Sequence, residues 1–205
     1  MMESNDAQFM RPHGEDGLKM IKEMNQGHED ISNFAMECID TSVDDDVLDI
    51  GCGGGVNIEK FLRRCPDGNV WGLDYSVVSV SESIKRNQEA VDMGRCQVIE
   101  ANVCNMPIDD DTFDIVSAFS SIYFWPDFKN TLKKVFKIIK TNGQFMIAYG
   151  SDGNDPNDED WVDADAGMTV YTEEQLIEYL RKAGFKEIKT YRKENTYILV
   201  VIAKK

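Results

Sequence analysis

Two carboxylates and a run of glycines in the first third of the chain have the types and spacing of a nucleotide-binding site. Asp49 lies in the short apolar run 47–50, and four glycines fall within the next five positions, 51–55. Glycine has no Cβ, so it adopts positive φ easily and lets a ligand touch the main chain. Asp74 ends a second apolar run, where a carboxylate can accept hydrogen bonds from both ribose hydroxyls. The pattern predicts a nucleotide held at the ends of two strands.

A strand, a glycine turn and a helix are the elements expected to position these groups. Ile58, Phe61, Leu62 and Cys65 recur at helical spacing after the turn, so the N-terminal amides of a helix should face the ligand. The glycines follow the spacing G-x-G-x-G, and Val56 stands where a dinucleotide fingerprint has its third glycine. This departure argues against a nicotinamide-dependent oxidoreductase.

The segment from Asp49 to Gly55, with Asp74, the segment 114–127 and Gly143, resembles the class I S-adenosylmethionine-dependent methyltransferases. The similarity covers residues 44–150 best and points to the small enzymes that include the quinone-biosynthesis C-methyltransferases. It implies S-adenosylmethionine as cofactor, S-adenosylhomocysteine as product and methyl transfer to a small-molecule acceptor. A non-catalytic S-adenosylmethionine-binding or sensor protein is the alternative, because every matched motif concerns the cofactor.

The resemblance also implies the cofactor-binding residues. Aligning the segment 106–108 with the family's Leu-Pro-Phe places Asn102 where an aspartate usually binds the adenine amino group, and Val103 where a backbone amide meets the ring. Asparagine keeps a carbonyl acceptor for this contact but lacks the charge. The full set expected is Asp49, Gly51, Cys52, Gly53, Gly55, Asp74, Tyr75, Ser76, Asn102, Val103 and Phe119.

The acceptor pocket is expected where three stretches outside the cofactor motifs meet: residues 25–28, the aromatic loop 120–125 and the acidic segment after Gly150. His28 and Tyr123 are the candidate catalytic residues in it. Imidazole titrates near neutral pH, so His28 is expected to act as a base or to contact the cofactor's carboxylate, and a tyrosine carries a polar tip on an apolar ring. The structural alternatives are a helix cap or surface group for His28 and core packing for Tyr123.

Acidic residues outnumber basic residues in the chain and cluster in its C-terminal third. The formal net charge is -15, and an acidic protein of this size repels a phosphate backbone, so nucleic acid is not an expected partner. The segment 152–165 contains seven acidic residues and no Lys or Arg. A solvated loop is the plainest interpretation, and a mobile lid that favours a neutral or cationic acceptor is the functional one. Pro156 argues against a calcium loop.

The whole pattern predicts an α/β fold with a Rossmann-like, doubly wound, seven-stranded mixed sheet, a C-terminal β-hairpin and an N-terminal helical cap. Residues 1–43 would form the arm and cap, and residues 44–205 the methyltransferase domain. A helix after Ser76 is expected to be apolar along Val77, Val80, Ile84 and Val91, and Asn142-Gly143 to close a helix over 128–139. The strands are expected at residues 47–50, 70–73, 97–102, 113–119, 144–149, 186–191 and 196–203.

Compartment and assembly follow from simpler features. No apolar run approaches the length of a membrane span, and the N-terminus lacks the basic and apolar regions of a signal peptide. The five cysteines show no C-x-x-C spacing, so reduced thiols are expected, with no disulfide framework and no metal site. The sequence thus predicts a cytoplasmic protein, monomeric or homodimeric.

Overall fold

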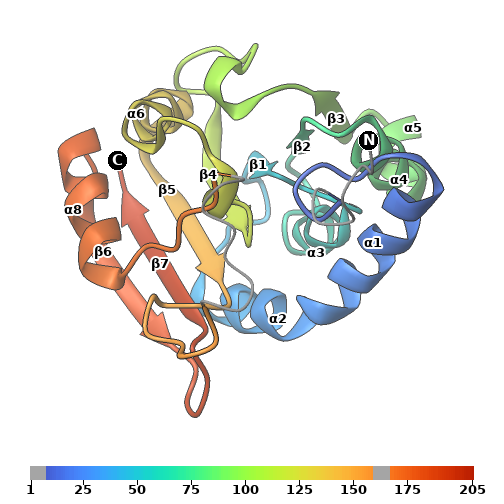
Figure 1. The fold of residues 1–205 in the computed structure, drawn as a ribbon. Coiled ribbons are helices and arrows are strands. Elements are labelled where there is room, and N and C mark those ends of the chain that lie inside the picture. Colours follow the sequence, from blue (N-terminus) through green and yellow to red (C-terminus); the bar gives the residue numbers. More distant parts are fainter. Residues whose placement is uncertain (1–7, 159–166) are drawn as a thin grey trace.

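The sheet of this chain has the expected mixed topology. The computed structural model describes residues 8–158 and 167–205. Its strands form one sheet in the order β3-β2-β1-β4-β5-β7-β6 (Figure 1). Strand β7 runs antiparallel to β5 and β6, and the other neighbouring pairs are parallel. The strands are β1 (Val47–Ile50), β2 (Val70–Asp74), β3 (Cys96–Glu100), β4 (Phe113–Phe119), β5 (Ile139–Tyr149), β6 (Lys186–Arg192) and β7 (Leu199–Lys204). The seven-stranded sheet and the C-terminal hairpin are confirmed.

Helices cover both faces of the sheet, as successive strand residues point to opposite sides. Leu48 and Ile50 of β1 pack in the cluster that contains the apolar residues of α6 and α8, whereas Val47 packs with those of α2 and α3. The helices are α1 (Gly14–Gly27), α2 (Glu29–Cys38), α3 (Val56–Arg64), α4 (Val77–Arg86), α5 (Gln88–Asp92), α6 (Phe128–Ile138) and α8 (Glu173–Ala183). Two 3-10 turns follow strands β3 and β4: η2 (Val103–Asn105) and η3 (Ile122–Phe124).

Helix α4 buries small polar side chains, which differs from the expected apolar face. Val77 is 59% exposed, while Ser79 and Ser83 are buried. The reason is close packing against the glycine turn, because a Cβ added at Gly55 would lie 2.5 Å from Ser83 Oγ. Ser76 caps α4 as expected, its hydroxyl accepting the backbone N–H of Ser79.

The Asn142-Gly143 pair also differs from its prediction, because it lies inside β5 and not at the end of a helix. Helix α6 ends at Ile138, and the strand begins at the next residue. Asn142 has φ 69°, and a Cβ at Gly143 would lie 2.7 Å from the carbonyl oxygen of Asp114 on β4. The pair thus marks a close approach of two backbones within the sheet.

Candidate active site

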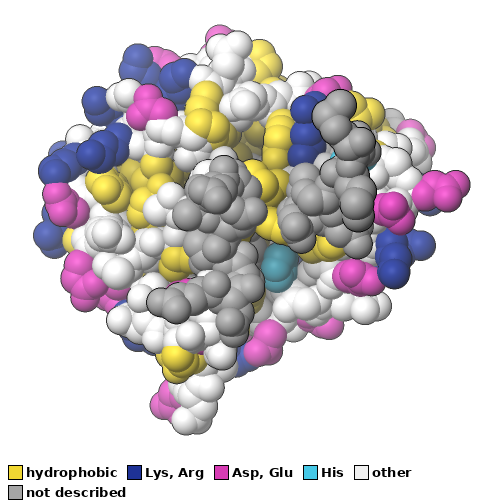
Figure 2. Space-filling model, viewed as in Figure 1, with side chains coloured by type: hydrophobic (Ala, Val, Ile, Leu, Met, Phe, Trp, Pro, Cys, Tyr) yellow, Lys and Arg dark blue, Asp and Glu magenta, His cyan; other side chains and the backbone are white. Residues whose placement is uncertain are grey.

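A cavity of about 470 Å³ lies beyond the carboxyl ends of β1, β2, β3 and β4. It is bounded by residues 50–54 after β1, 73–75 at the end of β2, 101–103 after β3 and 119–121 at the end of β4. The α1–α2 junction and the N-terminal arm contribute the remaining walls. Figure 2 shows hydrophobic side chains across the middle of this face and charged side chains around its periphery. This is the edge where ligands bind in open α/β sheets.

Three of the four glycines in the turn after β1, Gly51, Gly53 and Gly55, have positive φ, but they serve different purposes. A Cβ added at Gly51 would lie 2.5 Å from Cβ of Ser121, and one at Gly55 would meet Ser83. At Gly53, which lines the cavity, an added Cβ would meet nothing within 4 Å. Gly51 and Gly55 are therefore required by packing, whereas Gly53 leaves its main chain open to a ligand.

Asp74 ties the glycine turn to the start of α4 and lines the cavity. Its Oδ2 accepts the backbone N–H of Gly53 at 3.0 Å, and its Oδ1 accepts that of Ser76 at 2.9 Å. Burial raises the pKa of this carboxyl, and the hydrogen bonds from Ser76 and Gly53 oppose the rise. The carboxyl group is thus held rigidly at the rim of the cavity.

Asp49 and Cys52 lie deeper, on the face of the sheet that carries α3. Ser117 Oγ donates to Asp49 Oδ1 at 2.8 Å, while Oδ2 is buried without a hydrogen-bond partner in the described part of the chain. Burial raises the pKa of Asp49 to about 7. Burial also raises the pKa of the Cys52 thiol, which makes it a poor nucleophile although it lines the cavity.

Asn102 and Val103 close the end of the cavity beyond β3. The Asn102 side chain caps η2, because its Oδ1 accepts the backbone N–H of Cys104 at 2.8 Å. One lone pair of that oxygen therefore remains for a ligand. The predicted residues that line the cavity are His28, Gly51, Cys52, Gly53, Asp74, Tyr75, Asn102, Val103 and Phe119; Asp49, Gly55, Ser76 and Tyr123 are not among the lining residues.

The N-terminal arm forms a wall that the sequence did not predict. Tyr75 Oη donates to the carbonyl oxygen of Met10 at 2.5 Å, and Ser76 Oγ donates to that of Pro12 at 2.6 Å. The ring of Phe9 lies 5.8 Å from that of Phe124. These bonds join segments more than 60 positions apart, so no local pattern announces them. The arm bridges the end of β2 and the loop after β4.

The two candidate catalytic residues have different surroundings. His28 joins α1 to α2 and lines the cavity, and its side chain makes no capping hydrogen bond to α2. Burial lowers its pKa, so the imidazole is neutral at neutral pH and able to accept a proton. The Tyr123 ring packs against Phe124 and Tyr149 in the core, and burial raises the pKa of its phenol well above the usual value.

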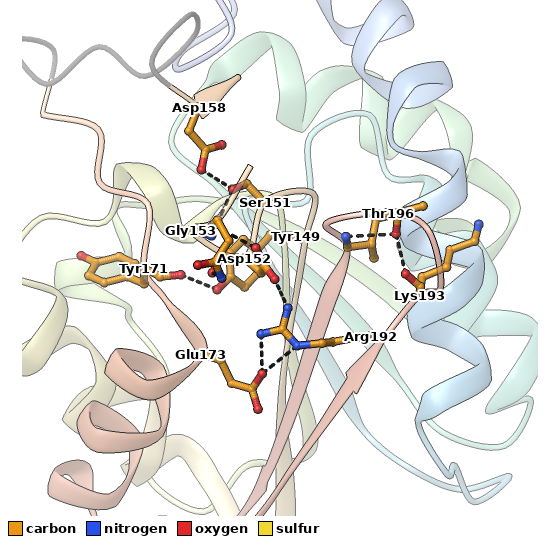
Figure 3. A network of polar contacts seen from close by, with 12 residues as sticks. Tyr149, Ser151, Asp152, Gly153, Asp158, Tyr171, Glu173, Arg192, Lys193 and Thr196 are labelled. Atoms are coloured by element: carbon orange, nitrogen blue, oxygen red, sulfur yellow. Dashed lines mark hydrogen bonds and ion pairs between the residues drawn. The ribbon is translucent and has the colours of Figure 1, made fainter. Parts of the chain in front are cut away.

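The acidic segment after Gly150 is anchored in its described part. Asp152 is buried and ion-paired with Arg192 of β6, which also contacts Glu173 at 2.6 Å (Figure 3). Ser151 Oγ donates to Asp158 at 2.6 Å. Asp152 thus contradicts the expectation of a solvated loop, and residues 151–158 are not among those that line the cavity. Glu159, Asp160, Asp163 and Asp165 lie outside the described residues.

Two of the three stretches expected around the acceptor do line the cavity. Asn25 and His28 come from the first stretch, and residues 120, 121, 124 and 125 come from the loop after β4. Gly167 also contributes, although no sequence signal singled it out. The cap and the aromatic loop therefore meet at this cavity, whereas the described part of the acidic segment does not.

Sequence comparison agrees with this geometry. Residues 48–147 match the family described as methyltransferase domain. The chain carries a methyltransferase domain. The 2-methyl-6-phytyl-1,4-hydroquinone methyltransferase 2 of Oryza sativa subsp. japonica is 29% identical over 175 residues, which cover 82% of this chain and 48% of the relative. The chain spans about half the length of the curated relatives it matches.

Solved structures give the methyltransferase domain the class I fold. An S-adenosylmethionine-dependent methyltransferase from Aquifex aeolicus matches with a TM-score of 0.71 and 17% identity, over 91% of this chain and 97% of the other. Another match is geranyl diphosphate C-methyltransferase from Streptomyces coelicolor A3(2), in complex with Mg2+, geranyl diphosphate and S-adenosyl-L-homocysteine. Its TM-score is 0.74 and its identity 14%, over 97% of this chain and 86% of the other. The predicted fold is confirmed, and residues 48–147 match a family of the predicted kind.

No helix in residues 8–158 and 167–205 has the length and apolar character needed to cross a bilayer. Within the same ranges, no three His, Cys, Asp or Glu side chains are grouped as ligands for a metal ion.

Proposed function

We propose that this protein transfers the methyl group of S-adenosylmethionine to a small-molecule acceptor. One observation carries the proposal: the main chain of Gly53 is open to a cavity whose rim holds the buried carboxyl of Asp74. A nucleoside needs this combination, with an acid for the ribose hydroxyls and a backbone surface without side chains. The matched domain family supports it.

The residues present fit this cofactor. Asp74 would hold the ribose, while Asn102 and Val103 would hold the adenine. The buried Asp49 Oδ2 has no hydrogen-bond partner in the described chain, and its charge would complement a cationic ligand. When bound, S-adenosylmethionine supplies an electrophilic methyl group with a built-in leaving group.

The chain's own contribution to catalysis is orientation and exclusion of water. The arm and the aromatic loop wall the cavity, and holding reactants in line can contribute about 7 to 11 kcal/mol. His28 is placed to accept a proton from an acceptor, because it lines the cavity in a neutral form. Tyr123 lies in the core with a raised pKa, so we assign it to packing beneath the aromatic loop.

The acceptor is proposed to be a neutral or cationic molecule with apolar character. Phe9, Phe119, Phe124 and Trp125 line the cavity, which suits an aromatic or aliphatic group. No Lys or Arg is found among the lining residues of the described chain, and the net charge of -15 disfavours a polyanion. The rice relative is named for a hydroquinone with a phytyl chain. An acceptor of this apolar kind fits the lining residues.

Equilibrium binding tests the first half of the proposal. Titration calorimetry with S-adenosylhomocysteine should show one site per chain, and NAD should show no binding under the same conditions. Binding of NAD without S-adenosylhomocysteine would refute the assignment. Binding of S-adenosylhomocysteine without methyl transfer to any metabolite would instead support the alternative, a sensor protein.

A further inference from the structure

A chain of polar side chains leads from the surface of α3 to the wall of the cavity. Lys60 Nζ on α3 donates to Ser32 Oγ on α2 at 2.6 Å. Ser32 Oγ donates to Asn57 Oδ1 at 2.5 Å. Ser32 is only 3% exposed, and both Ser32 and Asn57 line the cavity. This series of hydrogen-bonded side chains therefore ends at the space that the ligand would occupy.

The chemistry of the three side chains determines which of them donates and which accepts in each hydrogen bond. A lysine ammonium can only donate hydrogen bonds, so the Ser32 oxygen must accept from Lys60. A hydroxyl has a single proton, and the arrangement that uses it gives that proton to the carbonyl oxygen of Asn57. The Nδ2 group of Asn57 takes no part in this series of hydrogen bonds. In the described residues no hydrogen bond is found for it.

Further polar side chains line the same cavity as Asn57. Asn25 and His28, from the α1–α2 junction, line the same cavity. Helix α3 begins after Gly55 without a side-chain cap, so its positive end faces this region. An oriented amide donor in such surroundings favours a ligand group that accepts hydrogen bonds and carries negative charge.

We propose that Asn57 binds the carboxylate at the amino-acid end of the cofactor, and that Ser32 and Lys60 are positioning residues that aim its Nδ2. The inference rests on the proposed function. With adenine beyond β3 and ribose at Asp74 on β2, the rest of the ligand must extend along the sheet order toward β1 and the start of α3. Asn57 lies in the first turn of that helix.

A pair of ligands tests which ligand group Asn57 binds. Decarboxylated S-adenosylhomocysteine keeps the nucleoside, thioether and amine but lacks the carboxylate. Asn57→Ala should weaken binding of S-adenosylhomocysteine about tenfold or more, as expected for a hydrogen bond to a charged group, and leave the decarboxylated analogue unchanged in titration calorimetry. Equal losses for both ligands, or no loss for either, would overturn the inference. If the wild-type protein bound neither ligand, the proposed function itself would fail.

The positioning role is tested by non-additivity. Ser32→Ala should weaken S-adenosylhomocysteine binding severalfold, and the double variant Ser32→Ala/Asn57→Ala should bind no more weakly than Asn57→Ala alone. Asn33→Ala is the matched control, because it removes only the exposed hydrogen bond from Lys60 Nζ to Asn33 Oδ1. Additive losses, or equal losses for the decarboxylated analogue, would show that Ser32 merely supports the packing of α2 on α3. Circular dichroism establishes that each variant is folded.

Discussion

The two halves of the cavity are built in different ways. The half that we propose for the cofactor consists of strand ends and the turns that follow them, since Gly53 follows β1 and Asp74 ends β2. The half that we propose for the acceptor joins the arm, the α1–α2 junction and the loop after β4, which are distant in sequence. The first half depends on backbone conformation and the second on tertiary contacts. Substitutions in the first half should therefore affect cofactor binding, and those in the second should affect turnover.

The largest effect is expected where the main chain meets the ligand. Gly53→Val should weaken S-adenosylhomocysteine binding about a hundredfold or more, because a branched side chain would fill the open space next to the turn. Gly55→Ala is the contrasting variant, since it adds a collision of the new Cβ with Ser83 to the strain of a positive φ and should lower the thermal midpoint further. Calorimetry and thermal unfolding separate the two. If the Gly53→Val protein bound S-adenosylhomocysteine normally, the glycine turn would not be part of the cofactor site.

The acceptor half is probed by His28 and Tyr123. His28→Gln should lower kcat about a hundredfold if the acceptor must lose a proton, with little change in S-adenosylhomocysteine affinity. The wild-type kcat should fall as the pH drops through the His28 pKa, which burial places below its usual value of 6.5. Tyr123→Phe should change kcat little. A pH-independent kcat, or a larger loss for Tyr123→Phe, would reverse this assignment.

Asp74 should contribute a smaller but well-defined part of cofactor affinity. Asp74→Ala removes a hydrogen-bond acceptor for the ribose, and charge-assisted bonds of this kind contribute about 1.5 to 3 kcal/mol each. We expect S-adenosylhomocysteine to bind at least about tenfold more weakly. Circular dichroism is the control, because Asp74 also accepts the amides of Gly53 and Ser76. Unchanged affinity would exclude Asp74 from the ribose site.

Asp49 should make the stability of the protein depend on pH. Its pKa is about 7 in the folded protein against 3.8 ordinarily, so the folded state binds the extra proton between these values. The free energy of unfolding should therefore fall as the pH rises from about 4 to 7. Asp49→Asn should flatten this slope in urea titrations. The same slope in both proteins would show that the pKa of Asp49 is the same in the folded and unfolded states.

What the sequence could predict follows the same division. The sheet and most of the predicted residues that line the cavity were readable, because Asp49 lies next to the end of β1 and Asp74 ends β2, with glycines between them, and such features are local. The arm was not readable, since its bonds to Tyr75 and Ser76 depend on packing across more than 60 positions. The role that we propose for Asn57 was not predicted, because the orientation of its side-chain amide depends on a buried serine of another helix.

Methyl transfer itself provides the most direct test of the central claim. The protein would be incubated with methyl-labelled S-adenosylmethionine and fractionated small-molecule extract, and the label followed into each fraction. Our account predicts that label appears in an apolar, neutral or cationic metabolite in step with formation of S-adenosylhomocysteine, and that the Gly53→Val variant forms neither. Label that stays in S-adenosylmethionine while that ligand is bound tightly would contradict the claim of catalysis.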